Sequence, residues 1–164
     1  MSVNKNLPHV FVLPEDDANR QLAEGFHQQV DWNRYRQMQV LPVADGWRQV
    51  LHLFKSDYIA EMYRYSQRFM ILLIDFDDKE DRLGIAKADI PDDLADRVFI
   101  LGVWKEPEDL KRAGLGSYEN IGSRLAQDCC ENQYATWEHD LLQHNASELD
   151  RLREHIRPIL FQSI

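Results

Sequence analysis

The sequence has no hydrophobic run long enough to cross a membrane, and it has few cysteines. A membrane-spanning helix needs about 20 apolar residues in a row, whereas a prominent apolar run here, residues 69–74, has six. The two cysteines, Cys129 and Cys130, are adjacent, so they are a poor disulfide pair and lack the CxxC spacing of metal sites. The N-terminal residues 1–6 contain no apolar signal core. We therefore expect a cytoplasmic protein with no membrane partner, whose cysteines pack in a helix.

The sequence also lacks an excess of basic residues. It has 19 Lys and Arg against 28 Asp and Glu, which gives a net charge of −9. Because contacts with phosphate backbones favour a basic surface, this balance argues against a stand-alone, high-affinity nucleic-acid binder. It does not exclude an enzyme that meets phosphates through a metal ion, or one whose partner protein holds the nucleic acid.

The composition that is present is that of an ordinary globular domain. The chain has 164 residues, of which 44% are apolar and 29% charged, enough for one domain with a full core. No repeat, low-complexity tract or linker marks a second domain. Within this single domain we expect an α/β core over residues 9–113 and a helical C-terminal extension over residues 114–164.

The most informative stretch is residues 69–78, where six apolar residues lead into three carboxylates. The apolar run has the length and composition of a strand buried on both faces. Because side chains alternate along a strand, Asp75 and Asp77 are expected on the same side of its carboxyl end. Ligands of open α/β sheets bind at such ends, and carboxylates there suit a hard cation such as Mg²⁺. An ordinary solvated acidic turn is the alternative.

Strands and helices alternate along the predicted chain, which indicates a mainly parallel sheet covered on both faces. Strands are predicted over residues 9–13, 37–43, 69–75 and 97–104, and Pro42 favours an edge position for the second. Residues 78–96 are predicted to form a charged, irregular loop with a short helix at 92–96. Other helices are predicted over residues 17–29, 47–65, 107–112, 118–130, 134–144 and 147–157. The fold class is therefore α/β, a three-layer sandwich with a four-stranded sheet plus C-terminal helices.

Three of the four predicted strands end in acidic residues. They are followed by Glu15, Asp16 and Asp17, by Asp75, Asp77 and Asp78, and by Glu106 and Glu108. Asp16 or Asp17 is expected to cap the helix that begins there, whereas Glu15 points towards the same rim as Asp75. Three acidic strand ends in one sheet suggest a carboxylate cluster, since like charges gathered together are unfavourable without a cation.

This pattern resembles the TOPRIM fold, which is shared by topoisomerases, primases and OLD-family nucleases. That family has a Glu just after its first strand and an Asp-x-Asp after its third, which Glu15 and Asp75-Phe76-Asp77 match. The segment that leads to Asp45-Gly46 also looks like the family's second strand and its glycine-containing turn. The resemblance covers about residues 9–113, and the sequence has Asp16 where family members usually have a glycine.

The resemblance implies metal-dependent, nuclease-like cleavage or transfer at a phosphodiester, with Mg²⁺ or Mn²⁺ as cofactor. It implies that Glu15 is the general acid/base or a metal ligand. The implied ligands are Asp75 and Asp77, with Asp78 and either Glu106 or Glu108 as outer ligands or ligands of a second ion. The basic residues nearest in sequence that would neutralise a phosphate are Lys79, Arg82 and Lys105.

Two other interpretations of these residues stay open. A receiver-like phosphoacceptor domain also places acids after its first strand, an Asp after its third and a Lys after a late strand, as Asp16, Asp17, Asp75 and Lys105 do here. A non-catalytic regulatory or interaction protein would keep a TOPRIM-like scaffold with a degraded site. The net negative charge and the missing glycine favour that interpretation. The C-terminal helices either cover an edge of the sheet or form the surface of a homodimer.

Overall fold

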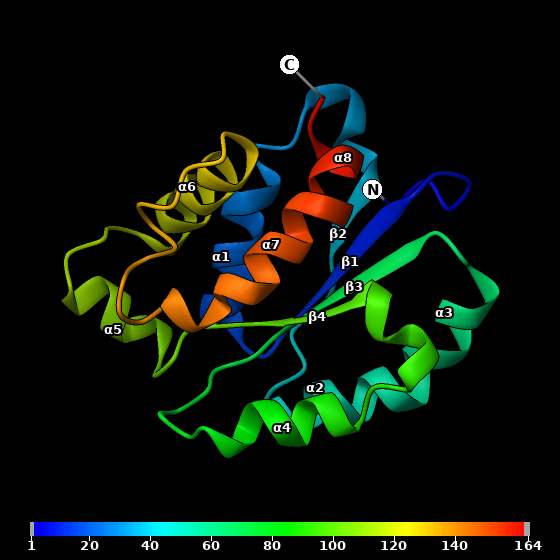
Figure 1. The fold of residues 1–164 in the computed structure, drawn as a ribbon, viewed down its shortest axis with the longest axis horizontal. Helices are drawn as coiled ribbons and strands as arrows, with labels where there is room; N and C mark the ends of the chain where they lie inside the picture. Colours follow the sequence, from blue (N-terminus) through cyan, green and yellow to red (C-terminus); the bar gives the residue numbers. More distant parts are fainter. Residues whose placement is uncertain (1, 163–164) are drawn as a thin grey trace.

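A computed structural model describes residues 2–162 and shows three layers, a sheet between two groups of helices (Figure 1). The four strands are β1 (His9–Pro14), β2 (Met38–Val40), β3 (Arg68–Leu73) and β4 (Val98–Leu101). All are parallel, in the order β2-β1-β3-β4. The predicted α/β class, parallel sheet and edge position of the second strand are confirmed. No helix in residues 2–162 is both long and apolar enough to span a bilayer.

The strands β1, β3 and β4 are buried on both faces because nearly all their side chains are apolar. Val12, Ile71 and Phe99 are in register across the sheet and contribute to the core on one face. Met70 and Val98, each one position earlier, contribute to the core on the other face. This alternation is the period-two geometry of a strand, and it places a hydrophobic core on each side of the sheet.

The helices form a layer on each face of the sheet (Figure 1). One layer contains α1 (Asp17–His27), α6 (Tyr118–Cys130), α7 (Ala146–His155) and α8 (Arg157–Leu160). The other contains α2 (Trp47–Leu53), α3 (Ile59–Arg64) and α4 (Asp81–Ala88). The remaining helical segments are α5 (Pro107–Arg112), the 3₁₀ turns η1 (Trp32–Gln37), η3 (Asp92–Arg97) and η4 (Gln143–Asn145), and the π-helical η2 (Phe54–Tyr58).

Two glycines let α1 and α6 pack closely. A Cβ atom at Gly25 would lie 2.1 Å from the Glu119 carbonyl oxygen, and one at Gly122 would lie 2.0 Å from the Leu22 carbonyl oxygen. Both distances are far below van der Waals contact, so each helix needs glycine where the backbone of the other crosses it. Cys129 is buried on α6 and both cysteines are free, as predicted.

The C-terminal segment covers the outer edge of β4. The Ile100 N–H donates to Glu148 Oε2 at 2.9 Å. The Asn145 amide accepts from the Gly102 N–H at 3.2 Å and donates to the Gly102 carbonyl at 3.0 Å. These side chains pair backbone groups that an uncovered edge strand would leave open to other chains. Of the two roles expected for the C-terminal helices, the structure shows the covering of a sheet edge.

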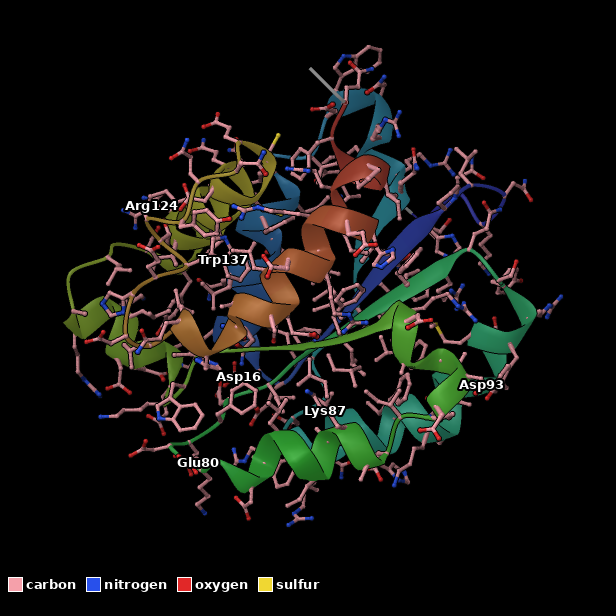
Figure 2. The ribbon with its side chains drawn as sticks, viewed as in Figure 1. Asp16, Glu80, Lys87, Asp93, Arg124 and Trp137 are labelled. Atoms are coloured by element: carbon pink, nitrogen blue, oxygen red, sulfur yellow. The ribbon has the colours of Figure 1, made fainter. Side chains whose placement is uncertain are left out.

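The helix predicted over residues 134–144 is wrong. Residues 134–142 form turns, because Trp137 anchors them to α6 instead of continuing a helix. The Trp137 ring is buried, and its Nε1 donates to the Leu125 carbonyl at 3.0 Å. Figure 2 labels Trp137 in the layer of α1, α6 and α7. The last predicted helix, over residues 147–157, also differs: α7 begins at Ala146, directly after its cap residue Asn145, and ends at His155, and Pro158 lies in the first turn of α8, where a proline is tolerated.

Two further predictions need correction on the opposite face. The predicted loop over residues 78–96 contains the helix α4, which buries Arg82 and Ala86. The helix predicted over residues 47–65 is divided into α2 and α3 by the π-helical segment η2. Within residues 47–65, the apolar residues Val50, Phe54 and Met62 recur at helical spacing, and all three are fully buried.

Replacing Asn145 with alanine should lower the free energy of unfolding by about 2–4 kcal/mol, because the N–H and carbonyl of Gly102 would lose their partners while buried. Urea denaturation measures this change. Asn33→Ala is the matched control, because Asn33 is exposed, and it should change stability by less than about 0.5 kcal/mol. Equal stability of the two variants would show that Asn145 does not stabilise the sheet edge.

Candidate functional site

The candidate site lies where the strand order reverses, between β1 and β3. β1 pairs with β2 on one side and with β3 on the other. In open parallel sheets this switch point is where ligands bind, just outside the carboxyl ends of the strands. Glu15 directly follows β1, and Asp75 follows β3 by two residues. Asp16, labelled in Figure 2, lies at the same edge of the sheet.

Glu15 is held by the segments on both sides of it. Its N–H donates to the Leu73 carbonyl at 2.9 Å, and its own carbonyl accepts from the Asp45 N–H at 2.8 Å. The Asp45–Gly46 turn has positive φ at both residues, as the predicted glycine turn requires. The carboxylate oxygen Glu15 Oε2 accepts from the Asp75 N–H at 2.6 Å. The prediction that Glu15 points to the rim at Asp75 is therefore confirmed.

Both carboxyl groups have raised pKa values. Burial raises the pKa of Glu15, and the Asp16 charge raises it further, although the Asp75 N–H lowers it. Burial also raises the pKa of Asp75, to about 8, with the charges of Glu15, Asp16 and Glu108 adding to the effect. Asp75 is only 8% exposed, and its Oδ1 accepts from Asn19 Nδ2 at 2.9 Å. A strong shift caused by burial and like charges, such as that of Asp75, is typical of functional acids.

Asp77 and Asp78 do not follow the strand geometry on which their prediction depended. β3 ends at Leu73, and Asp77 and Asp78 have left-handed φ values of 51° and 56°. The Asp77 carboxylate is 3.8 Å from the Arg82 guanidinium, and Asp78 Oδ1 accepts from Trp104 Nε1 at 2.5 Å. Both residues are exposed. They flank the Glu15–Asp75 pair and are engaged by neighbours of their own.

Arg82 is the predicted phosphate-binding residue that contacts the pair. Its Nη1 donates to the Asp75 carbonyl at 2.6 Å, and its guanidinium lies 4.5 Å from the centre of the Trp47 ring. Its Nε is buried without a hydrogen-bond partner. Lys79 and Lys105 are exposed and form no ion pair within residues 2–162. Their long side chains are therefore not fixed at the site.

The third acidic strand end, which follows β4, contributes through Glu108. Glu106 is the N-cap residue of α5, whereas the charge of Glu108 raises the pKa of Asp75. Tyr118, at the start of α6, is buried, and its pKa is raised by burial and by the charges of Glu108, Asp16 and Asp75. Its phenol group thus lies among the acids of the site.

Two residues near the acids, Asn19 and Tyr118, were not predicted as site residues. Asn19 has a signal in the sequence: it precedes Leu22 and Phe26 by three and seven positions, so it is a polar residue on the apolar face of α1. Tyr118 has no such signal, because its place at the site depends on how α6 packs against α1.

The donor set fits a hydrated divalent cation. Within residues 2–162, no three or more acidic, histidine or cysteine side chains are already arranged to hold a metal ion. Mg²⁺, however, is commonly bound by one or two carboxylates, with water and substrate phosphates as its other ligands. Glu15 and Asp75 supply two carboxylates. The neighbouring Asn19 Oδ1 is buried and has no hydrogen-bond partner, so a further oxygen of the kind that Mg²⁺ prefers is unused.

Similarity to known proteins does not identify this site. Comparison of the chain with family models, curated proteins and solved structures found no match. The resemblance to the TOPRIM fold therefore depends on Glu15, Asp75 and Asp77 and on the parallel sheet that carries them.

The raised pKa of Asp75 predicts a pH-dependent stability in the absence of divalent cations. The pKa is about 8 in the folded protein against an ordinary value of 3.8, so between these values the folded state holds a proton that the unfolded chain has released. The stability that Asp75 contributes is full below about pH 4 and is lost as the pH rises to about 8.

Asp75→Asn removes this titration, and the variant should be more stable than the wild type above pH 8 by on the order of 2 kcal/mol. Urea denaturation in EDTA at several pH values measures both quantities. Asp92→Asn, at an exposed acid of η3, makes the same change in charge away from the site. Identical pH profiles for the wild type and Asp75→Asn would contradict the assigned pKa.

Proposed function

We propose that this chain binds Mg²⁺ or Mn²⁺ at Glu15 and Asp75 and processes phosphodiester bonds in a metal-dependent, nuclease-like reaction. The observation that carries the proposal is the pair of hydrogen-bonded acids at the switch point between β1 and β3, the half-buried Glu15 and the buried Asp75. Two like charges in such a place are unfavourable alone and become favourable with a cation between or beside them.

The neighbouring Arg82 forms no ion pair with Glu15 or Asp75 within residues 2–162, although its charge lowers the pKa of Glu15. The Arg82 Nη1 hydrogen bond goes to the Asp75 carbonyl, and its only ion pair within residues 2–162, at 3.8 Å, is with Asp77. The carboxylates of Glu15 and Asp75 are instead each bonded by a neutral donor, the Asp75 N–H and the Asn19 amide. The pair is therefore ionised fully only when a ligand balances its charge, and without one Asp75 keeps its proton up to about pH 8.

In the proposed reaction the cation, Glu15 and Arg82 have different roles. A bound divalent cation would stabilise charge on the phosphate and activate a water molecule. Glu15 is the proton acceptor in this proposal, because burial raises its pKa towards neutrality, where a general base is most effective. The water oxygen forms a bond to phosphorus, its proton goes to Glu15, and the bond to the leaving oxygen breaks. Arg82 lies beside Asp75 as the basic group nearest to a bound phosphate, although its unpartnered Nε is buried in this structure and would have to become accessible to contact a phosphate oxygen.

The net negative charge of the chain affects which substrates it can bind by itself. With a net charge of −9 the chain repels long polyanions. The proposal therefore assigns the capture of nucleic acid to a partner protein and only the contact with a phosphate to this chain.

A second candidate function is a non-catalytic regulatory or interaction protein that keeps the cation-binding scaffold. The observation that favours it is the engagement of Asp77 and Asp78 by Arg82 and Trp104, since it leaves two carboxylates where a two-metal site would use more. Cation binding without phosphodiester cleavage would identify this function.

Isothermal titration calorimetry with Mn²⁺ tests the first step. We expect one site in the wild type and a loss of affinity of at least about tenfold in Asp75→Asn and in Glu15→Gln, because each variant removes one of two carboxylates. Asp92→Asn is the control with the same loss of charge, and its affinity should match the wild type. A wild type that binds no Mn²⁺, or an Asp75→Asn variant that binds it equally well, would refute the site.

Assays with a single-stranded oligonucleotide and with a small-molecule phosphodiester test the second part of the proposal, the cleavage of a phosphodiester bond. Turnover that needs Mn²⁺ and is lost in Glu15→Gln would support the nuclease-like reaction. Binding of Mn²⁺ with no turnover of either substrate would exclude hydrolysis by this chain alone and leave the regulatory function.

A further inference from the structure

We infer that Asn19 is a positioning residue of the cation site, whose amide group holds the Asp75 carboxylate in place from the first turn of α1. This inference rests on the proposed function, because it concerns the orientation of a proposed ligand. It assigns to Asn19 a role that neither its helix position nor the packing of α1 requires.

The amide of Asn19 bridges two carboxylates from different parts of the chain. Its Nδ2 donates to Asp75 Oδ1 at 2.9 Å and to Asp16 Oδ1 at 3.0 Å. Asp16 is fixed in turn, because the same oxygen caps α1 by accepting from the Asn19 backbone N–H at 3.0 Å. The bridge therefore fixes one oxygen of Asp75 to the start of α1 and leaves the other free of side-chain hydrogen bonds within residues 2–162.

The burial of Asn19 is unfavourable for stability alone. Its side chain is fully buried, and its Oδ1 has no hydrogen-bond partner. A buried acceptor without a partner lowers the stability of the fold, whereas the other buried positions of the same helix carry small or apolar residues such as Leu22 and Ala23. The two hydrogen bonds that Asn19 Nδ2 donates to Asp16 and Asp75 offset this unfavourable burial.

The hydrogen bonds of Asn19 also offset the repulsion between the charges of Asp16 and Asp75. Asp16 is one of the charges that raise the pKa of Asp75, while the Asn19 hydrogen bond lowers it. Two N–H bonds directed at two acids keep the carboxylates close without a positive side chain, which would compete with a cation. A carboxylate that is held this way presents its remaining oxygen in one orientation, as a ligand set requires.

The chain offers a matched control at the equivalent position of another helix. Asn120 occupies the same place in α6 as Asn19 does in α1, and its backbone N–H donates to the Oγ of the cap residue Ser117 at 3.2 Å. Asn120 is exposed, and no carboxylate accepts from its side chain within residues 2–162. Substitutions of Asn120 therefore reproduce the effect on the helix terminus alone.

The test measures Mn²⁺ affinity of the full chain by calorimetry in the wild type, Asn19→Asp, Asn19→Ser, Asn120→Asp and Asn120→Ser. We expect Asn19→Asp to lose affinity by at least about tenfold although it adds a negative charge, because it replaces both donors by a repelling carboxylate. Asn19→Ser, which retains one hydroxyl donor, should lose less. Both Asn120 variants should stay within about twofold of the wild type.

A gain or no change in Mn²⁺ affinity in Asn19→Asp would overturn the inference, because charge attraction without positioning predicts that result. Circular dichroism shows whether each variant is folded, and a misfolded Asn19→Asp leaves Asn19→Ser as the deciding variant. A loss of affinity in Asn19→Ser beyond that of Asn120→Ser supports the inference, and equal affinity in the two variants overturns it.

A second readout separates this inference from the proposed function. The ¹³C chemical shift of the Asp75 carboxyl, measured without any metal, should change in Asn19→Ser and stay constant in Asn120→Ser. If the wild type binds no Mn²⁺, the proposed function fails, and the carboxyl shift still decides the role of Asn19. An Asp75 signal that is the same in all folded variants would show that Asn19 does not position it.

Discussion

The structure depends on one constraint at its centre, which is that parallel strands in the order β2-β1-β3-β4 bring the ends of β1 and β3 together. Because of this order, Glu15 and Asp75, far apart in the sequence, are joined by a 2.6 Å hydrogen bond. Burial of both acids raises their pKa values, so the pair is unfavourable unless protons or a cation neutralise it. The neighbouring features, including the Asn19 bridge and the Arg82 bond to the Asp75 carbonyl, hold this pair in place without a direct ion pair to either carboxylate within residues 2–162.

The strands and the acid pair could be predicted because their signals are local. Apolar runs such as residues 69–74 require burial on both faces, and a parallel sheet then brings acids after successive strands to one edge. The sheet class and the place of Glu15 followed from those two rules, and the edge position of β2 followed from Pro42. The α4 helix and the turns around Trp137 did not, because tertiary contacts, such as the Trp137 bond to the Leu125 carbonyl, decide between helix and turn there.

The details of the site depend on geometry that a residue pattern does not contain. Asp77 matched an Asp-x-Asp spacing, yet its left-handed backbone takes it out of the strand alternation that the spacing assumed. Glu108 and Tyr118 lie near enough to the acids for charge interactions because of how α5 and α6 pack after β4, with α6 against α1. Asn19 was visible in principle, as a polar residue on an apolar helix face, but its two carboxylate partners were not.

A Mn²⁺ soak of crystals, read by anomalous diffraction, tests the central claim most directly. The account predicts one anomalous peak about 2.0–2.6 Å from a carboxylate oxygen of Asp75 and within the same coordination sphere as Glu15, with water as the other ligands. Asp75 Oδ1 should keep its bond to Asn19 Nδ2 in that structure. A crystal saturated with Mn²⁺ that shows no peak at Glu15 and Asp75, or peaks only at exposed acids elsewhere, would contradict it.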